Sequence, residues 1–193
     1  MQHRTARQPA HDQGGLPMDD DAGLSAELAT VVAGARRRAL RDGDRQIDTA
    51  HLLHSLLESD PEVRATVGEA PQLARLLGYL VQRSIGYGLR WQSGVEDSGA
   101  IAVVPDPAPY DGEPKETGGW SPVAAAAMEE ARRRARRRGE TCAGGIDLLA
   151  ALVVDPQSRA VEVLERAGIP AGDLRARVEA RAGQYAEEGG AAC

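Results

Sequence analysis

Residues 24–43 read LSAELATVVAGARRRALRDG, and residues 120–139 read WSPVAAAAMEEARRRARRRG. A shift of 96 residues lays the second stretch on the first, so that Ser25 matches Ser121 and Gly43 matches Gly139. The same shift places a leucine-rich stretch at 52–57 on a similar one at 148–153. Because one offset holds through two elements and the turn between them, we predict a tandem duplication.

The first stretch of each copy has the pattern of an amphipathic helix. Leu28, Val31 and Ala35 recur at helical spacing, and the second copy keeps apolar residues at the matching positions. Ser25 and Ser121 suit the N-cap, because a hydroxyl oxygen accepts a hydrogen bond from a free amide of the first turn. Glycine after the helix suits the left-handed position that commonly ends one.

Each copy is expected to contain three further helices. The leucine-rich stretch forms the second helix, and an Asp-Pro pair, at 60–61 and at 155–156, marks the turn that follows it. Short third helices are expected near 63–67 and 160–167, and fourth helices near 73–89 and 174–182. We predict an all-α fold of two four-helix units, packed as a pseudo-two-fold eight-helix domain because each unit alone is small.

Composition divides the chain into two repeats, a connection and two tails. A disordered tail is expected at 1–23, the first repeat at 24–92, a linker or loop at 93–119, the second repeat at 120–183 and a flexible tail at 184–193. The connection holds four prolines and a short stretch at 100–104 that is expected to be extended.

Charge and cysteine content limit the classes of function. The net charge is −6, so the chain as a whole does not attract nucleic acid. The two cysteines, Cys142 and Cys193, form no CxxC pair, which indicates a reducing compartment. The sequence shows no secretory signal and no apolar run long enough to cross a membrane. We therefore expect a cytoplasmic protein.

The second helix carries the motif that resembles a known family. Its sequence TAHLLHSLL, at 49–57, follows the T-x-H-L-L-x-x-L-L pattern of the Clp repeat, and 145–152, GIDLLAAL, is a more divergent copy. The stretch VLERAGI at 163–169 is also similar to the family's third helix and turn. Over about residues 24–183 the chain resembles the double Clp repeat at the N-terminus of ClpC-type unfoldases.

This resemblance implies a binding module rather than an enzyme. In the family, the module receives substrates and adaptors and passes them to an ATPase motor that feeds a peptidase. No G-x-x-x-x-G-K-[ST] loop is present to hold the phosphates of ATP. The resemblance therefore implies a stand-alone module without ATPase activity. It would bind peptides, client proteins, adaptors or cyclic-peptide antibiotics of the Clp system, and would either deliver substrates or sequester ligands.

The resemblance also assigns candidate partner-binding residues. In the ClpC type, a glutamate of the T-E-H motif helps to hold phosphoarginine, and this chain has Ala50 and Ile146 at those positions. Neither side chain can accept a hydrogen bond from a guanidinium group, which puts that chemistry in doubt. The family's aromatic residue before the first helix corresponds to Leu24 and Trp120, which would supply apolar surface. The full candidate set is Leu24, Ser25, Thr49, Ala50, Trp120, Ser121 and Ile146.

No pattern in the sequence indicates catalysis, a cofactor or a metal. His51 and His54 are three residues apart, but further ligands are not apparent nearby, and we predict capping or packing roles for both. The hydroxyl groups of Ser25, Thr49 and Ser121 lack a motif that would place a base beside them.

The strongest charge feature is the arginine run in the first helix of the second copy. Three interpretations stay open: a solvated helix face, a docking patch for an acidic partner, and a nucleic-acid contact, which the lack of interleaved aromatic residues disfavours. The second function hypothesis is accordingly a structural or regulatory protein that docks through this run. The patch comprises Arg132, Arg133, Arg134, Arg136, Arg137 and Arg138.

Overall fold

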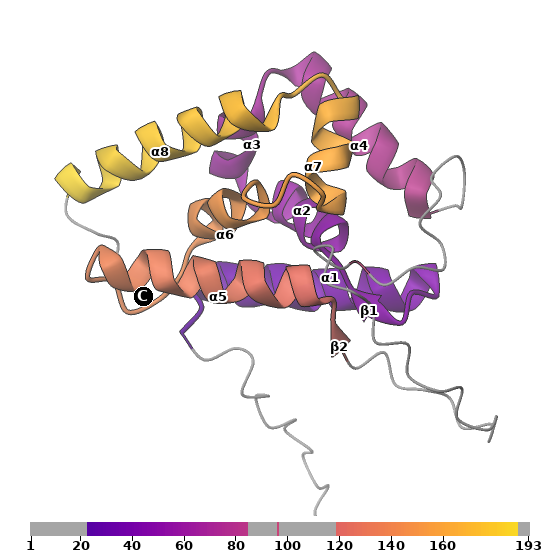
Figure 1. Ribbon diagram of the computed structural model, residues 1–193, viewed down its shortest axis with the longest axis horizontal. Coiled ribbons are helices and arrows are strands. Elements are labelled where there is room, and N and C mark those ends of the chain that lie inside the picture. The colour runs from indigo at the N-terminus through magenta and orange to yellow at the C-terminus, as the bar shows by residue number, and fades with distance from the viewer. Residues whose placement is uncertain (1–22, 85–95, 97–118, 189–193) are drawn as a thin grey trace, which may run out of the picture.

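The computed structural model describes residues 23–84, 96 and 119–188, and eight helices lie within them (Figure 1). Each repeat supplies four of these helices, as the duplication predicts. The first repeat forms α1 (Ala26–Asp42), α2 (Thr49–Ser59), α3 (Pro61–Val67) and α4 (Ala70–Ser84), and the second forms α5 (Pro122–Arg137), α6 (Gly145–Leu152), α7 (Arg159–Arg166) and α8 (Ala171–Glu188).

Local chemistry fixes the ends of the first helix in both repeats. The hydroxyl oxygen of Ser25 accepts a hydrogen bond from the amide of Leu28, and that of Ser121 accepts one from Ala124. After the helix, Gly43 (φ 73°) and Gly139 (φ 81°) both adopt the left-handed conformation, which glycine reaches without steric cost. The predicted caps and glycine turns are confirmed.

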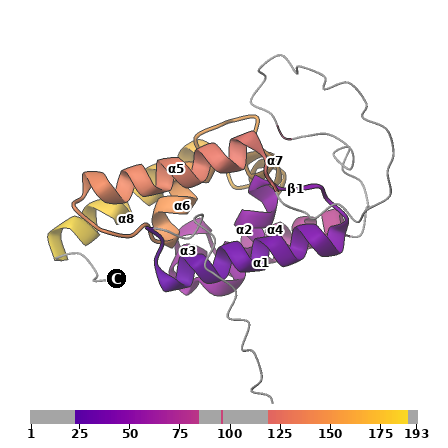
Figure 2. The ribbon, with the colours of Figure 1, turned by 90° about the horizontal axis from the view of Figure 1, so that it is seen from below.

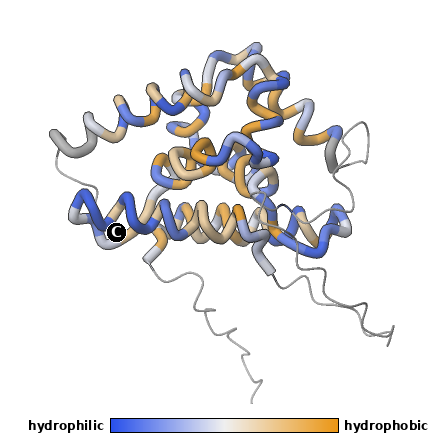
Figure 3. Tube along the Cα trace, viewed as in Figure 1, coloured by the Kyte–Doolittle hydropathy of each residue, from blue (hydrophilic) through white to orange (hydrophobic). Residues whose placement is uncertain are grey.

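The second helix of each repeat lies at the centre of the molecule. In Figure 1, α2 and α6 lie between α1 and α5 on one side and the remaining four helices on the other. α2 contacts α1, α3 and α4 of its own repeat and α5, α6 and α7 of the other. Figure 3 shows hydrophobic residues concentrated on these two central helices, and all four leucines of α2 are at most 1% exposed.

The two repeats exchange their leading segments, which are the residues just before the first helix: Leu24 in the first repeat and Gly119–Trp120 in the second. The two-residue strand β1 (Gln46–Ile47) pairs in parallel with β2 (Gly119–Trp120), and a matching single bridge joins Leu24 to Ala143. Each contact joins the residue before the first helix of one repeat to the residues before the second helix of the other. Figure 2 shows α1 and α5 running along the same face of the molecule, as this pseudo-two-fold arrangement requires.

The predicted boundaries can be compared with the structure only in part. The tail at 1–22, the extended stretch at 100–104 and most of the connection at 93–119 lie outside the described residues. The last helix, α8, runs to Glu188, five residues past the end expected for the second repeat. Cys142 is disulfide-bonded, which differs from the free thiols that the predicted reducing compartment implies. None of the helices between residues 23 and 188 that the structure describes is long and apolar enough to span a membrane.

Candidate functional site

The exchange of leading segments brings the predicted partner-binding residues together in two composite sites. Trp120 and Ser121 of the second repeat lie at the start of α2 of the first, and the Ser121 amide donates to the carbonyl oxygen of Ile47 (2.8 Å). Leu24 and Ser25 of the first repeat lie at the start of α6, where the Ser25 amide donates to the carbonyl oxygen of Ala143 (3.0 Å).

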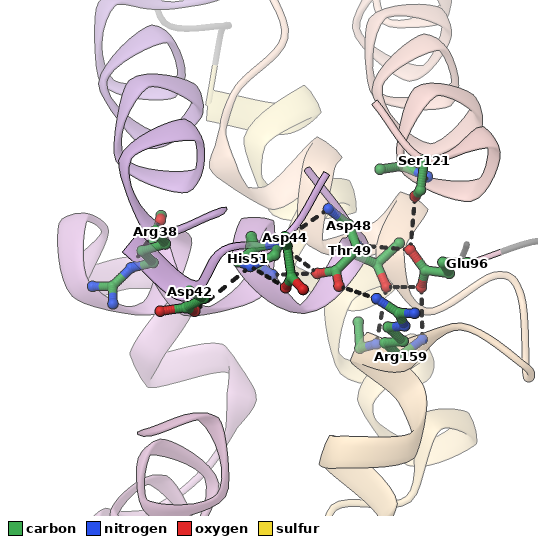
Figure 4. A network of polar contacts seen from close by, with 12 residues as sticks. Arg38, Asp42, Asp44, Asp48, Thr49, His51, Glu96, Ser121 and Arg159 are labelled. Atoms are coloured by element: carbon green, nitrogen blue, oxygen red, sulfur yellow. Dashed lines mark hydrogen bonds and ion pairs between the residues drawn. The ribbon is translucent and has the colours of Figure 1, made fainter. Parts of the chain in front are cut away.

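The first composite site is organised around the carboxylate of Glu96 (Figure 4). Its oxygens accept hydrogen bonds from the amide of Thr49 (2.9 Å), the hydroxyl of Ser121 (2.8 Å) and the amide of Arg159 (2.7 Å). The hydroxyl of Thr49 donates to the same carboxylate and accepts from the amide of Ala160 (3.0 Å). Glu96 is 6% exposed, so this carboxylate supplies buried acceptors to both repeats.

A chain of charged groups continues from this carboxylate into the first repeat. The guanidinium of Arg159 donates to Oδ2 of Asp48 (2.6 Å), and Oδ1 of Asp48 caps α2 by accepting from the amide of His51 (2.9 Å). His51 also contacts Asp42, the last residue of α1, and Asp44, which lies two residues beyond it. Figure 4 shows these residues in one line across the interface between the repeats.

His54, one turn beyond His51, lies in a different environment. Burial lowers its pKa from 6.5 to about 4, and the nearby positive charge of Arg38 acts in the same direction. Its Nε2 lies 3.4 Å from a carboxylate oxygen of Glu58, whose own pKa is lowered by its hydrogen bond to Arg38. Burial alone would raise the pKa of Glu58, but the hydrogen bond and the positive charge of Arg38 lower this pKa by more. The two histidines therefore do not converge on a shared site.

The second composite site is a pocket of about 400 Å³ at the start of α6. Ser25 and Ile146 both line it, as does Asp60, which caps α3 through Oδ1. On its wall, Arg138 donates to both oxygens of Asp147 (2.5 and 2.7 Å) and to Glu140 (2.8 Å). These bonds to carboxylates raise the pKa of Arg138 above its ordinary value.

Several predicted contact residues are less accessible than the sequence suggested. Thr49 and Ala50 are 0% and Ser121 is 1% exposed, and the hydroxyl groups of Thr49 and Ser121 bond within the chain. Trp120 and Ile146 are half-buried and pack against the core. Trp120 and Ile146 are therefore more accessible than the predicted contact residues of the central helix α2.

Most arginines of the run on α5 form ion pairs with acidic side chains. Arg133 and Arg137 pair with Glu130 (2.5 and 3.5 Å), and Arg136 pairs with Glu129 (2.8 Å). The pairing with Arg136 lowers the pKa of Glu129. The run thus forms a mixed-charge surface instead of an uninterrupted positive stripe.

Part of this run borders a groove between α5, α6 and α8, with a volume of about 460 Å³. Its charged residues are four arginines and three acidic residues: Arg133, Arg134, Arg137, Arg175, Glu130, Asp155 and Glu179. Alanine side chains, Val123, Leu152 and the 52% exposed Val154 give it apolar walls.

Arg134 is the most deeply placed arginine of the groove. Its Nη2 donates to Glu179 (2.9 Å), and this bond lowers the pKa of Glu179. Its Nε is buried and makes no hydrogen bond to any residue that the structure describes. A buried donor without an acceptor is costly, and Arg134 carries this cost in the wall of the groove.

Two sets of polar residues in the first composite site carry no clear signal in the sequence. Glu96 and Arg159 lie far apart in the chain and are joined only by the fold, so no local signal marks them. The aspartates around His51 show only the spacing D-x-D-x-x-x-D-x-x-H at 42–51.

Comparisons with known proteins place the fold. No protein-family model and no curated protein matches the sequence, but 28 chains of solved structures match. One is the N-terminal domain of the caseinolytic protease associated chaperone ClpD from Arabidopsis thaliana, at 17% identity and a TM-score of 0.58, covering 86% of this chain and 97% of that one. Another comes from structural investigations of a malarial protein secretion system, at 15% identity and a TM-score of 0.57, covering 84% of this chain and 96% of that one. The two helical repeats and their exchanged leading segments therefore form the fold of the Clp N-terminal domain.

Proposed function

We propose that this chain is a non-catalytic protein-binding module, which takes an acidic and partly apolar segment of a partner protein into the groove between α5, α6 and α8. The observation that carries the proposal is the groove itself, which combines four arginines, three of them from α5, with three acidic residues and apolar walls. Carboxylates of a bound segment would pair with the arginines, while its apolar side chains would cover Val123, Leu152 and Val154.

The fold supports a binding role of this kind. The similar ClpD domain is part of a chaperone associated with the caseinolytic protease, so clients and adaptors of a Clp system are the partners that we propose first. Cyclic-peptide ligands would be expected at the half-buried Trp120 and Ile146. Because most arginines of α5 are paired with carboxylates, they favour a protein partner of mixed charge over nucleic acid. Nucleic acid is bound through phosphate contacts that release counterions and through bases that stack on aromatic side chains.

Replacing two exposed arginines of the groove should weaken binding of an acidic peptide about tenfold. Arg133 and Arg137 are 48% and 63% exposed, and each exposed charge pair contributes about 0.2–1 kcal/mol, so that two pairs contribute up to about 2 kcal/mol. The test is fluorescence anisotropy with a labelled peptide that alternates glutamate and leucine, titrated with the wild type and with the Arg133→Gln, Arg137→Gln double variant.

The duplication provides a matched control. Arg37 and Arg41 occupy the equivalent positions on α1, which border neither pocket described above. The Arg37→Gln, Arg41→Gln variant loses the same charge and should bind the peptide like the wild type. Equal weakening in both double variants, or no binding by the wild type, would contradict the proposed groove.

A further inference from the structure

The wall of the pocket beside Ser25 and Ile146 contains a cysteine that forms a disulfide bond. Cys142 lies in the turn between α5 and α6 and lines this pocket of about 400 Å³. It is disulfide-bonded, and the sequence contains one other cysteine, Cys193. Cys193 is therefore the residue that can form this bond, which would bring the chain beyond α8 to the wall of the pocket.

The end of α8 lies within reach of this position. Ala182 of α8 lines the same pocket, and the helix continues from there for six residues, or about 9 Å, to Glu188. The five residues that follow can span up to about 17 Å when extended. In Figures 1 and 2, the end of α8 lies on the same side of the molecule as the turn between α5 and α6. A segment of this length can therefore pass over the pocket on its way to Cys142.

The first repeat contains a precedent for such a return of the chain. Beyond α4, Glu96 comes back to the start of α2, where its buried carboxylate fills the first composite site and bonds to Thr49 and Ser121. The offset of 96 residues places Gly145 and Ser25 at the matching positions of the second composite site. Among the described residues, that site has a pocket where the first has a carboxylate. A segment that follows α8 would complete the symmetry.

We propose that residues 189–193 cover the pocket beside Ser25 and Ile146, and that a disulfide bond between Cys142 and Cys193 holds them there as a redox switch. The segment reads GGAAC, so its side chains are small and uncharged. It adds no negative side chain to a lining that is already acidic, and its two glycines permit the turn that must follow the helix. The acidic residues of the lining are Glu27, Asp60, Glu62, Glu140 and Asp147.

Reduction would open this switch. The thiolate of a dithiol reductant attacks one sulfur of the disulfide, forms a mixed disulfide and releases the other cysteine as a thiolate, which takes up a proton. The second thiol of the reductant then displaces the first cysteine and closes the reductant's own disulfide. Two electrons and two protons thus pass from the reductant to Cys142 and Cys193. The switch acts separately from the groove between α5, α6 and α8, which Cys142 does not line.

Equilibration of the full chain with glutathione redox buffers tests the proposal. Free thiols are then alkylated, and peptide mapping by mass spectrometry gives the fraction of chains with a bond between Cys142 and Cys193. Because the fold would hold the segment at the pocket, we expect the effective concentration of the two thiols to be at least about tenfold higher in the folded chain than in urea. Equal values in the two states, or no such bond in the folded chain, would overturn the proposal.

A charge placed in the segment provides a matched pair of variants. Ala192→Asp adds a negative charge beside the acidic lining and should lower the effective concentration of the thiols about threefold in the folded chain. Ala180→Asp adds the same charge at an exposed position of α8 that does not line the pocket, and it should have no effect. If the two variants behaved alike, the segment would not lie over the pocket.

Amide chemical shifts separate a covered pocket from a disulfide that leaves the pocket open. The bond alone changes the environment of residues next to Cys142, whereas a covering segment also shifts lining residues that are distant from Cys142 in the sequence. We expect the reduced wild type and the Cys193→Ser variant to differ from the oxidised wild type at Ala26, Glu62 and Ala182, in the same direction. Unchanged amides at all three of these residues would show that the segment does not cover the pocket.

Discussion

Replacing Glu96 by alanine should lower the free energy of unfolding by about 3 kcal/mol. Its buried carboxylate accepts from the amides of Thr49 and Arg159 and from the hydroxyls of Thr49 and Ser121. Each buried donor left without an acceptor costs about 1–3 kcal/mol, and water entering the vacated space would recover part of the sum. The loss would lower the melting temperature by about 10 °C in a chain of this length.

Thermal and urea unfolding of the wild type and the Glu96→Ala variant measure this effect. Glu69→Ala serves as the control, because Glu69 is an exposed glutamate for which the described residues provide no side-chain hydrogen bond. That variant should unfold like the wild type. If Glu96→Ala matched the wild type as well, the carboxylate would not join the repeats in solution.

Acidification should destabilise the chain through His54. The pKa of this histidine falls from its ordinary value of 6.5 to about 4 in the folded chain, so folding favours the neutral imidazole. Its contribution is complete above pH 6.5 and is lost as the pH falls toward 4. For a shift of this size, stability should fall by about 2 kcal/mol between pH 7.5 and pH 5.

Urea unfolding at a series of pH values, in the presence of chelator, measures this loss. His54→Gln keeps a polar side chain of similar length that does not titrate, so its stability should vary less with pH over the same interval. The remaining histidines stay in place and serve as the internal reference. An unchanged pH dependence in His54→Gln would contradict the assignment.

The duplication made the helices predictable, but it did not predict how they are assembled. Helical spacing and the paired serine caps belong to local sequence, so α1 and α5 follow from it directly. The exchange that joins Leu24 to Ala143 and Trp120 to Ile47 depends on how two repeats pack, and no local pattern records it. A resemblance to the Clp repeat implied the fold, which the solved structures confirm.

The candidate site was harder to predict because polar residues of α2 are buried. Thr49, His51, His54 and Ser55 would form a solvated face on a surface helix, yet all are at most 5% exposed here. The reason is that α2 contacts helices on all sides, and partners from distant segments satisfy its polar groups. Glu96 is such a partner. It could not be predicted, because it lies in a stretch whose composition indicates only a loop.

Amide chemical-shift mapping of the full chain with the acidic peptide tests most directly whether this is a protein-binding module with its site in the groove. We predict that the largest shifts fall on groove residues of α5, α6 and α8, such as Ala127, Leu152 and Glu179. The matching residues of the first repeat, Val31 on α1 among them, should stay unshifted. Shifts centred on the pocket beside Ser25 and Ile146, or no shifts at saturating peptide, would contradict the account.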